Sequence, residues 1–133
     1  MSATYYVEGA EETKFGLDSE GRFDPHILSH QIATYGMQWA RAKAAAELLE
    51  QTRLPYLSRL TNQARAQNPE LSRKEAEDIA MASEDYRTHI LEAIEARQRA
   101  DIVKAKWEAV KALADGLRTA EASRRAERNS YTR

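Results

Sequence analysis

The hydrophobic positions between residues 28 and 60 follow a heptad pattern. Their spacings alternate between four and three residues without a slip, and Arg53 is the one polar member. The stripe consists of Leu28, Ile32, Tyr35, Trp39, Ala42, Ala46, Leu49, Arg53, Tyr56 and Leu60. An apolar stripe with a period of about 3.5 residues is typical of a helix that packs lengthwise against another helix. The pattern therefore predicts helix pairing, within the chain, between chains, or both.

A second stripe of the same kind lies in the C-terminal half. It runs through Ile79, Ser83, Tyr86, Ile90, Ala93, Arg97 and Ala100, and continues through Val103, Trp107, Val110, Ala114 and Leu117. The step from Ala100 to Val103 is three residues where four is due, which overwinds a helix pair locally. We expect the larger members of both stripes to form the core seam or an oligomer seam.

Local signals mark where these helices begin and end. Asp24 is a favourable N-cap and Pro25 suits the first helical position. The pair Asn68-Pro69 ends the first helix, because the residue before a proline is disfavoured in the helical region. Ser72 and Glu75 have the spacing of a capping box, which starts the second helix near residue 73.

Three features along these helices leave alternatives open. Pro55 removes a helical hydrogen bond, but the heptad phase continues through it and Leu54 would be a poor N-cap. We therefore expect one kinked helix there rather than two. Ser83 can cap a new helix, which would leave 73–82 as a short separate piece. Gly36 is unfavourable in a helix by about 1 kcal/mol and is expected where another backbone approaches closely.

Together these signals predict an all-α fold: a long antiparallel, coiled-coil-like helical hairpin with a short N-terminal arm. The expected segments are an acidic arm at 1–24, a hairpin domain at 25–128 with helices at about 25–67 and 73–128, and a flexible tail at 129–133. A turn near residue 70 places Trp39 within about one helical turn of Trp107. The two indoles are therefore expected in the same layer of the seam.

The arm and the small core both bear on assembly. Within the arm, residues 4–7 and 14–17 could form short strands, and we expect order there only if the arm docks on the helices or on a neighbour. A bare two-helix hairpin buries too little apolar surface for ample stability. We therefore expect the chain to form a homo-oligomer.

Residues typical of catalytic or metal sites form no convincing constellation. The chain has no cysteine, which excludes disulfides and thiolate metal sites. His26 and His30 have a metal-binding helical spacing, but they lack a third convincing ligand, so a solvated face is the favoured interpretation. Phosphate-binding glycine loops and catalytic triad patterns are absent. We expect no enzymatic activity, no cofactor and no metal.

The chain also lacks targeting signals that would place it in a membrane. No stretch approaches the roughly 18–20 apolar residues needed to cross a bilayer, and the first residues do not resemble a signal peptide. The C-terminal segment has charge but no wide apolar face, which disfavours a membrane-surface helix. We expect no membrane association and a cytoplasmic location.

Charge is distributed unevenly along the chain. Residues 1–24 carry six acidic and two basic side chains, whereas residues 97–133 carry ten basic and five acidic ones. Lys104, Lys111, Arg118 and Arg125 repeat every seven residues and so share one helical flank, to which Arg124 and Arg128 add further charge. Such a row can neutralise successive phosphates of a nucleic acid. Alternatively, it is a solvated flank that pairs with acidic residues of a neighbouring helix.

The stretch from Asp24 to Glu50, DPHILSHQIATYGMQWARAKAAAELLE, resembles the opening helix of the UvsY-type phage recombination mediators. The overall plan of an acidic arm and two long helices around a short polar link is also similar. The resemblance implies a small helical protein that forms ring-like homo-oligomers, binds single-stranded DNA, displaces single-strand-binding protein and helps to load a recombinase. It further implies DNA contacts near the end of the first helix, where Arg59 and Arg65 lie in this chain.

The leading hypothesis is therefore a phage-type accessory protein that binds single-stranded DNA non-specifically and assists recombinase assembly. Its partners would be further copies of itself, single-stranded DNA, and a recombinase or single-strand-binding protein, in the host cytoplasm if a phage encodes it. The alternative hypothesis is a helical protein-interaction module, such as a scaffold, chaperone or inhibitor, without nucleic-acid binding.

Overall fold

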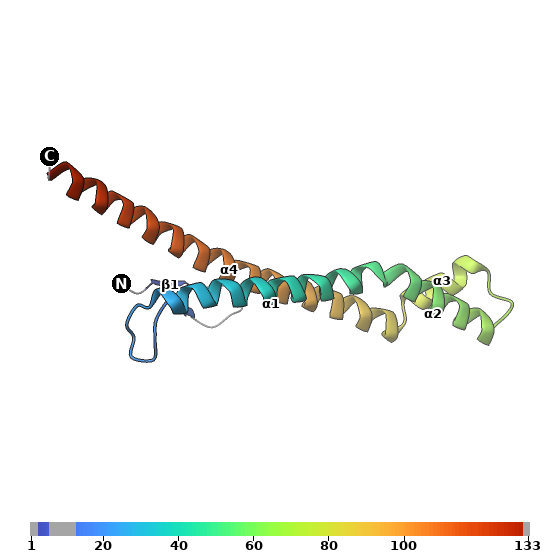
Figure 1. Ribbon diagram of the computed structural model, residues 1–133. Coiled ribbons are helices and arrows are strands. Elements are labelled where there is room, and N and C mark those ends of the chain that lie inside the picture. The colour runs from blue at the N-terminus through green and yellow to red at the C-terminus, as the bar shows by residue number, and fades with distance from the viewer. Residues whose placement is uncertain (1–2, 6–12, 132–133) are drawn as a thin grey trace. The chain divides into compact units, whose positions relative to one another are not determined.

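The computed structural model describes residues 3–5 and 13–131 (Figure 1). Its elements are β1 (Ala3–Tyr5), β2 (Thr13–Phe15), α1 (Pro25–Gln51), α2 (Arg53–Gln67), α3 (Arg73–Met81) and α4 (Glu84–Tyr131). The fold is all-α, an antiparallel helical hairpin with a short arm, as the sequence predicts. The chain divides into two compact units, and each is described by itself: unit 1 is Met1–Trp39 with Asp101–Arg133, and unit 2 is Ala40–Ala100.

The predicted helix starts are confirmed by their hydrogen bonds. At the start of α1, the Asp24 carboxylate accepts from the His26 amide at 2.9 Å. At the start of α3, the Ser72 hydroxyl accepts from the Glu75 amide at 3.1 Å. Both bonds satisfy backbone donors that have no partner within the helix. The predicted end is also confirmed, because α2 stops at Gln67 and Asn68 is extended, with φ −138° and ψ 92°.

The prediction of one kinked helix over 25–67, rather than two helices, was wrong, because α1 and α2 are separated at Thr52. Pro55 has no amide proton to offer the Gln51 carbonyl, which weakens the helical ladder one turn earlier. The Thr52 hydroxyl donates to the Leu48 carbonyl at 2.8 Å. Helical spacing nevertheless continues across the junction, because the Thr52 amide bonds Leu48 and the Tyr56 amide bonds the Thr52 carbonyl, each at 3.0 Å.

The second predicted helix, 73–128, is divided into α3 and α4, and the alternative start at Ser83 is the one observed. The Ser83 hydroxyl accepts from the Tyr86 amide at 3.2 Å and donates to the Ala80 carbonyl at 2.6 Å. The expectation of a flexible tail at 129–133 was wrong as far as residue 131, because α4 continues to Tyr131. Most residues of 120–128 are favourable helix formers, and together with the Arg125–Glu121 pair at i,i+4 they stabilise the turns that lead to this end.

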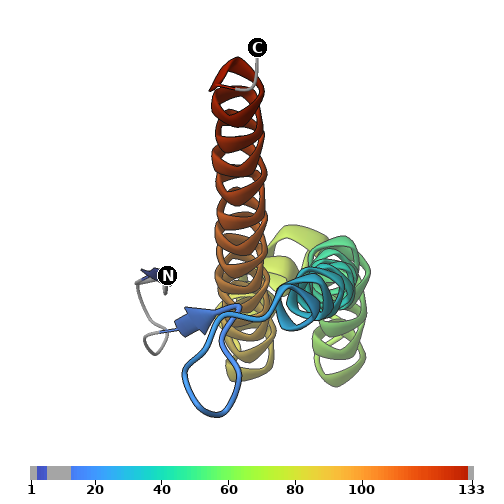
Figure 2. The ribbon, with the colours of Figure 1, turned by 60° about the vertical axis from the view of Figure 1, so that its left-hand side comes forward.

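In unit 1, the arm contributes its largest buried side chain to the core. Phe15 is fully buried and packs with Leu28 of α1 and Val110 of α4. Its ring meets Tyr35 edge-on at 6.0 Å, and the neighbouring Gly16 amide donates to the Gln31 side chain at 2.8 Å. These contacts hold β2 and the following loop against the start of α1 (Figure 2). The arm therefore docks on the helices through Phe15 and Gly16.

The second strand of the arm ends at Phe15, before the end of the expected strand at 14–17. β1 and β2 pair antiparallel with Ala3 opposite Phe15, and Leu17 forms a separate bridge with Phe23. The expected strand at 4–7 overlaps β1, but residues 6 and 7 lie outside the described residues. The Leu17–Phe23 bridge closes a small hairpin around Asp18, whose carboxylate accepts from two backbone amides.

In unit 2, α2 packs against α3 and the first turns of α4. Leu57, Leu60, Ala80 and Tyr86 form the buried cluster. Ile79 was expected on the stripe but is 52% exposed. The break at Ser83 takes α3 out of phase with α4, so Ala76 and Ala80 are buried instead.

Elsewhere the seam follows most of the two predicted stripes, but Leu57 and Ala96 are buried although neither is on a stripe, and Arg53 is exposed. The buried large members of the stripes are Leu28, Leu60, Tyr86 and Val110. Its half-buried large members are Ile32, Tyr35, Trp39, Leu49, Tyr56, Ile90, Val103 and Trp107.

Candidate nucleic-acid interface

Unit 1 contains a stacked tryptophan pair that joins α1 to α4. The rings of Trp39 and Trp107 lie 5.1 Å apart at an interplanar angle of 23°. The predicted common layer is thus confirmed. Gly36 lies against the same indole, since a Cβ atom placed there would be 3.1 Å from Nε1 of Trp107. The close approach expected at Gly36 therefore involves an aromatic side chain rather than another backbone.

Two lysines of the predicted basic row lie over this pair. The Lys111 ammonium is 3.6 Å from the centroid of the Trp107 ring, and the Lys104 ammonium is 5.8 Å from that of Trp39. Both distances are within the range of cation–π attraction. We refer to Trp39, Lys104, Trp107 and Lys111 as the Trp–Lys cluster. Its indoles are half-buried, so the cluster is part of both the core and the surface of unit 1.

The remaining cations of the row are paired along α4 itself. Arg118 lies 3.8 Å from Asp115, and Arg125 lies 3.0 Å from Glu121. Lys104 is also 4.0 Å from Glu108. The acidic partners are thus on the same helix, not on a neighbouring one. Exposed ion pairs of this kind contribute about 0–1 kcal/mol to stability. A phosphate can therefore replace the acidic partner of such a cation at little loss of free energy.

The last turns of α4 carry the other predicted cations of this half. All described side chains from Arg118 to Tyr131 are exposed, Arg124 and Arg128 among them. This stretch is polar on every side and extends as a helix past the start of α1 (Figure 1). A helix without an apolar face relies on i,i+4 pairs within itself, which agrees with the Arg125–Glu121 contact.

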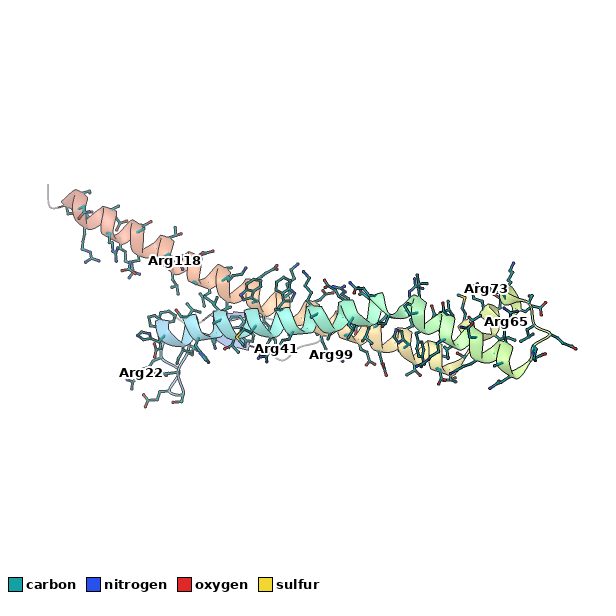
Figure 3. All side chains as sticks on the ribbon, turned by 45° about the vertical axis from the view of Figure 1, so that its right-hand side comes forward. Arg22, Arg41, Arg65, Arg73, Arg99 and Arg118 are labelled. Atoms are coloured by element: carbon teal, nitrogen blue, oxygen red, sulfur yellow. The ribbon has the colours of Figure 1, made fainter. Side chains whose placement is uncertain are left out.

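The predicted nucleic-acid residues are divided between the two units, since Arg59 and Arg65 belong to unit 2 and the basic row of α4 belongs to unit 1. The guanidinium of Arg59 lies 4.9 Å from the centroid of the Tyr56 ring. Arg65 is exposed in the last turn of α2, and Figure 3 shows it at the same end of unit 2 as Arg73.

His89 has contacts that the sequence did not predict. Its ring stacks on Tyr56 with centroids 4.8 Å apart, and its Nε2 lies 3.0 Å from the Leu49 carbonyl oxygen. A signal was present in the sequence. The antiparallel register that pairs Trp39 with Trp107 also places Tyr56 opposite residue 90, next to His89.

Comparisons with protein-family models, with curated proteins and with solved structures find no match. None of the described helices is both long and apolar enough to cross a membrane. Among the same residues, no group of three or more His, Cys, Asp or Glu side chains is placed to share a metal ion.

Unit 2 also carries an apolar groove of about 280 Å³ between α1 and α4, lined in part by Ile90, Ala93 and Ile94. At its edge Arg97 binds Glu50 through two nitrogens, with Nε to Oε1 at 3.0 Å and Nη2 to Oε2 at 2.8 Å. The hydrogen bonds from Arg97, aided by its charge and opposed by desolvation, lower the pKa of the Glu50 carboxyl.

Proposed function

We propose that this protein binds single-stranded nucleic acid, and single-stranded DNA in particular, without sequence preference. The Trp–Lys cluster carries the proposal: a stacked aromatic pair with an ammonium group over each indole, within a row of cations spaced by seven residues. Proteins of this class combine aromatic surfaces for the bases with cations for the phosphates. The cluster offers both, with Trp107 and the two lysines on α4 and Trp39 on α1.

The charge of the C-terminal segment supports the same function. Residues 97–133 carry ten basic and five acidic side chains, and the pairs observed along α4 are exposed. Exposed pairs are weak, whereas each phosphate that replaces an acidic partner releases condensed counterions. Binding should therefore be driven by charge and should weaken steeply as salt is added.

The experiment is fluorescence anisotropy of labelled oligo-dT at about 50 and about 200 mM salt. Neutralising about four phosphates predicts an affinity loss of about 50-fold over that range. The variant Lys104→Gln with Lys111→Gln removes the cations of the cluster and should lower the slope of log affinity against log salt by about 1.4.

A matched control is Lys43→Gln with Lys74→Gln, which makes the same charge change in unit 2. This control should retain the slope of the unmodified protein. Equal losses in both double variants would show that net charge, and not the cluster, governs binding. A folded protein that fails to bind oligo-dT at low salt would overturn the proposed function.

The resemblance to UvsY-type mediators leads us to propose the cellular role as well: assistance to recombinase assembly on DNA coated with single-strand-binding protein. The test is the rate at which a recombinase filament forms on such DNA with and without this protein. An unchanged rate, despite tight binding to the DNA, would limit the function to binding.

A protein-interaction role is the second candidate, favoured by the apolar groove of unit 2. Ile94, which lines the groove from α4, is 49% exposed. We propose that a second copy of the chain covers this groove, because a two-helix hairpin by itself buries little apolar surface. Light scattering of the unmodified protein and of Ile94→Glu tests this self-association, with a lower mass expected for the variant.

A further inference from the structure

A second cation–aromatic arrangement lies in unit 2, at the junction of α1 and α2. A groove of about 280 Å³ is lined there by Thr52, Pro55, Tyr56 and Arg59, with His89 of α4 completing the wall. The sequence explains the opening. Pro55 interrupts the helical ladder, and the Thr52 hydroxyl turns back to the Leu48 carbonyl at 2.8 Å.

The aromatic wall of this groove is held in place. The rings of Tyr56 and His89 stack at 4.8 Å with an interplanar angle of 18°. His89 Nε2 lies 3.0 Å from the Leu49 carbonyl oxygen, which can only accept a hydrogen bond, so Nε2 carries the proton. In the neutral ring, Nδ1 then remains as an acceptor. The wall thus combines a stacking surface with a hydrogen-bonding atom.

Arg59 differs from most cations of the predicted basic row. Lys104, Arg118 and Arg125 each have an acidic neighbour on α4, whereas Arg59 makes no ion pair within the described part of the chain. Its guanidinium lies 4.9 Å from the centroid of the Tyr56 ring. A planar guanidinium can bind a phosphate through two parallel hydrogen bonds.

We infer that this groove is a nucleotide-binding subsite of unit 2, in which Arg59 binds a phosphate and the Tyr56–His89 pair contacts the base. The ligand is one nucleotide unit of a single strand, so the inference rests on the proposed function. It assigns base contact to Tyr56, which the sequence predicts as a seam residue, and to His89.

The test compares oligo-dT with an abasic strand of equal length, because the abasic strand keeps the phosphates and lacks the bases. Stacking contributes about fivefold or more in affinity per base, so the unmodified protein should prefer oligo-dT at least fivefold. His89→Gln should reduce that preference. Arg59→Gln should weaken binding to both strands and lower the salt slope by about 0.7.

Arg73→Gln is the matched control, since it removes one exposed arginine of unit 2 outside the groove. Circular dichroism establishes whether each variant is folded. If His89→Gln does not fold, the affinity and salt slope of Arg59→Gln test the subsite by themselves. If Arg59→Gln and His89→Gln bind oligo-dT and the abasic strand with the same affinities as Arg73→Gln, the subsite is ruled out and the proposed function is unaffected. Failure of the unmodified protein to bind oligo-dT would instead remove the proposed function itself.

Discussion

Replacement of Gly36 by alanine tests whether the tryptophan pair is rigidly packed. A Cβ atom at this position of α1 would lie 3.1 Å from Nε1 and 3.3 Å from Cε2 of Trp107. The indole has little room to retreat, because Trp39 stacks on it at 5.1 Å and the Lys111 ammonium lies 3.6 Å from its centroid. The new methyl group must therefore displace a ring that is held by other contacts.

Two opposing contributions set the magnitude. Alanine is favoured over glycine inside a helix by about 1 kcal/mol. Overpacking a filled site costs about 1–3 kcal/mol, and contacts of 3.1 and 3.3 Å at Trp107 correspond to the middle of that range. We expect Gly36→Ala to lower the free energy of unfolding by about 1 kcal/mol.

Gly116→Ala is the matched control, because Gly116 lies within α4 and has nothing within 4 Å of its added Cβ. This variant should gain about 1 kcal/mol from helix propensity alone. The two variants should thus differ by about 2 kcal/mol in urea unfolding followed by tryptophan fluorescence. If Gly36→Ala were as stabilising as Gly116→Ala, the indole would be free to shift and the argument for a rigid pair would fail.

Three further predictions concern stability. Phe15→Ala should lower the free energy of unfolding, measured by urea denaturation, by about 3–5 kcal/mol because Phe15 is fully buried. A loss below about 1 kcal/mol would show that the arm does not dock in solution. Ser83→Ala removes the cap of α4 and should cost about 1 kcal/mol in thermal unfolding; an unchanged midpoint would contradict the cap. Arg97 holds the pKa of Glu50 below the ordinary value of 4.5, so its stabilisation is present above that pH and is lost as the pH falls through the lowered pKa. Glu50→Gln should therefore flatten the dependence of stability on pH below 4.5, and an unaltered profile in unfolding titrations would show that the pair does not form in solution.

The sequence predicted the hairpin and its seam because heptad spacing is a long-range signal that many residues repeat. Trp39 and Trp107 could be placed in one layer from the turn position alone, and they stack in the structure. Helix starts were equally accessible, since Asp24 and Ser72 act through bonds to amides two or three residues away. Such features depend only on local chemistry and on counting residues.

The errors have a common physical origin, which is competition between a local backbone signal and the heptad phase. At Thr52 the missing amide proton of Pro55 outweighs the uninterrupted stripe, although helical spacing resumes at once. At Ser83 the capping hydroxyl outweighs a stripe that continues on both sides. The pattern of apolar residues does not show which of the two contributions is larger.

The candidate site could be predicted less fully than the fold, and the reason lies in the side chains. A row of cations at seven-residue intervals is visible in the sequence, but whether each cation faces an acid, an indole or solvent depends on rotamers. Arg118 pairs with an acid of its own helix and Lys111 lies over an indole, so two equivalent heptad positions have different environments.

Both cation–aromatic arrangements follow from one property of the seam. Lys111 lies four residues after Trp107, and Arg59 lies three residues after Tyr56, so each cation is a helical neighbour of an aromatic seam residue. In each case the ring packs against a second ring from the opposite side of the hairpin, Trp39 or His89. The same residues therefore stabilise the hairpin and form the candidate binding surface. It follows that substitution of an aromatic residue changes stability and affinity together. Removal of Arg59 separates the two, because its side chain is exposed and contributes little to folding, whereas it would supply a full phosphate contact in binding.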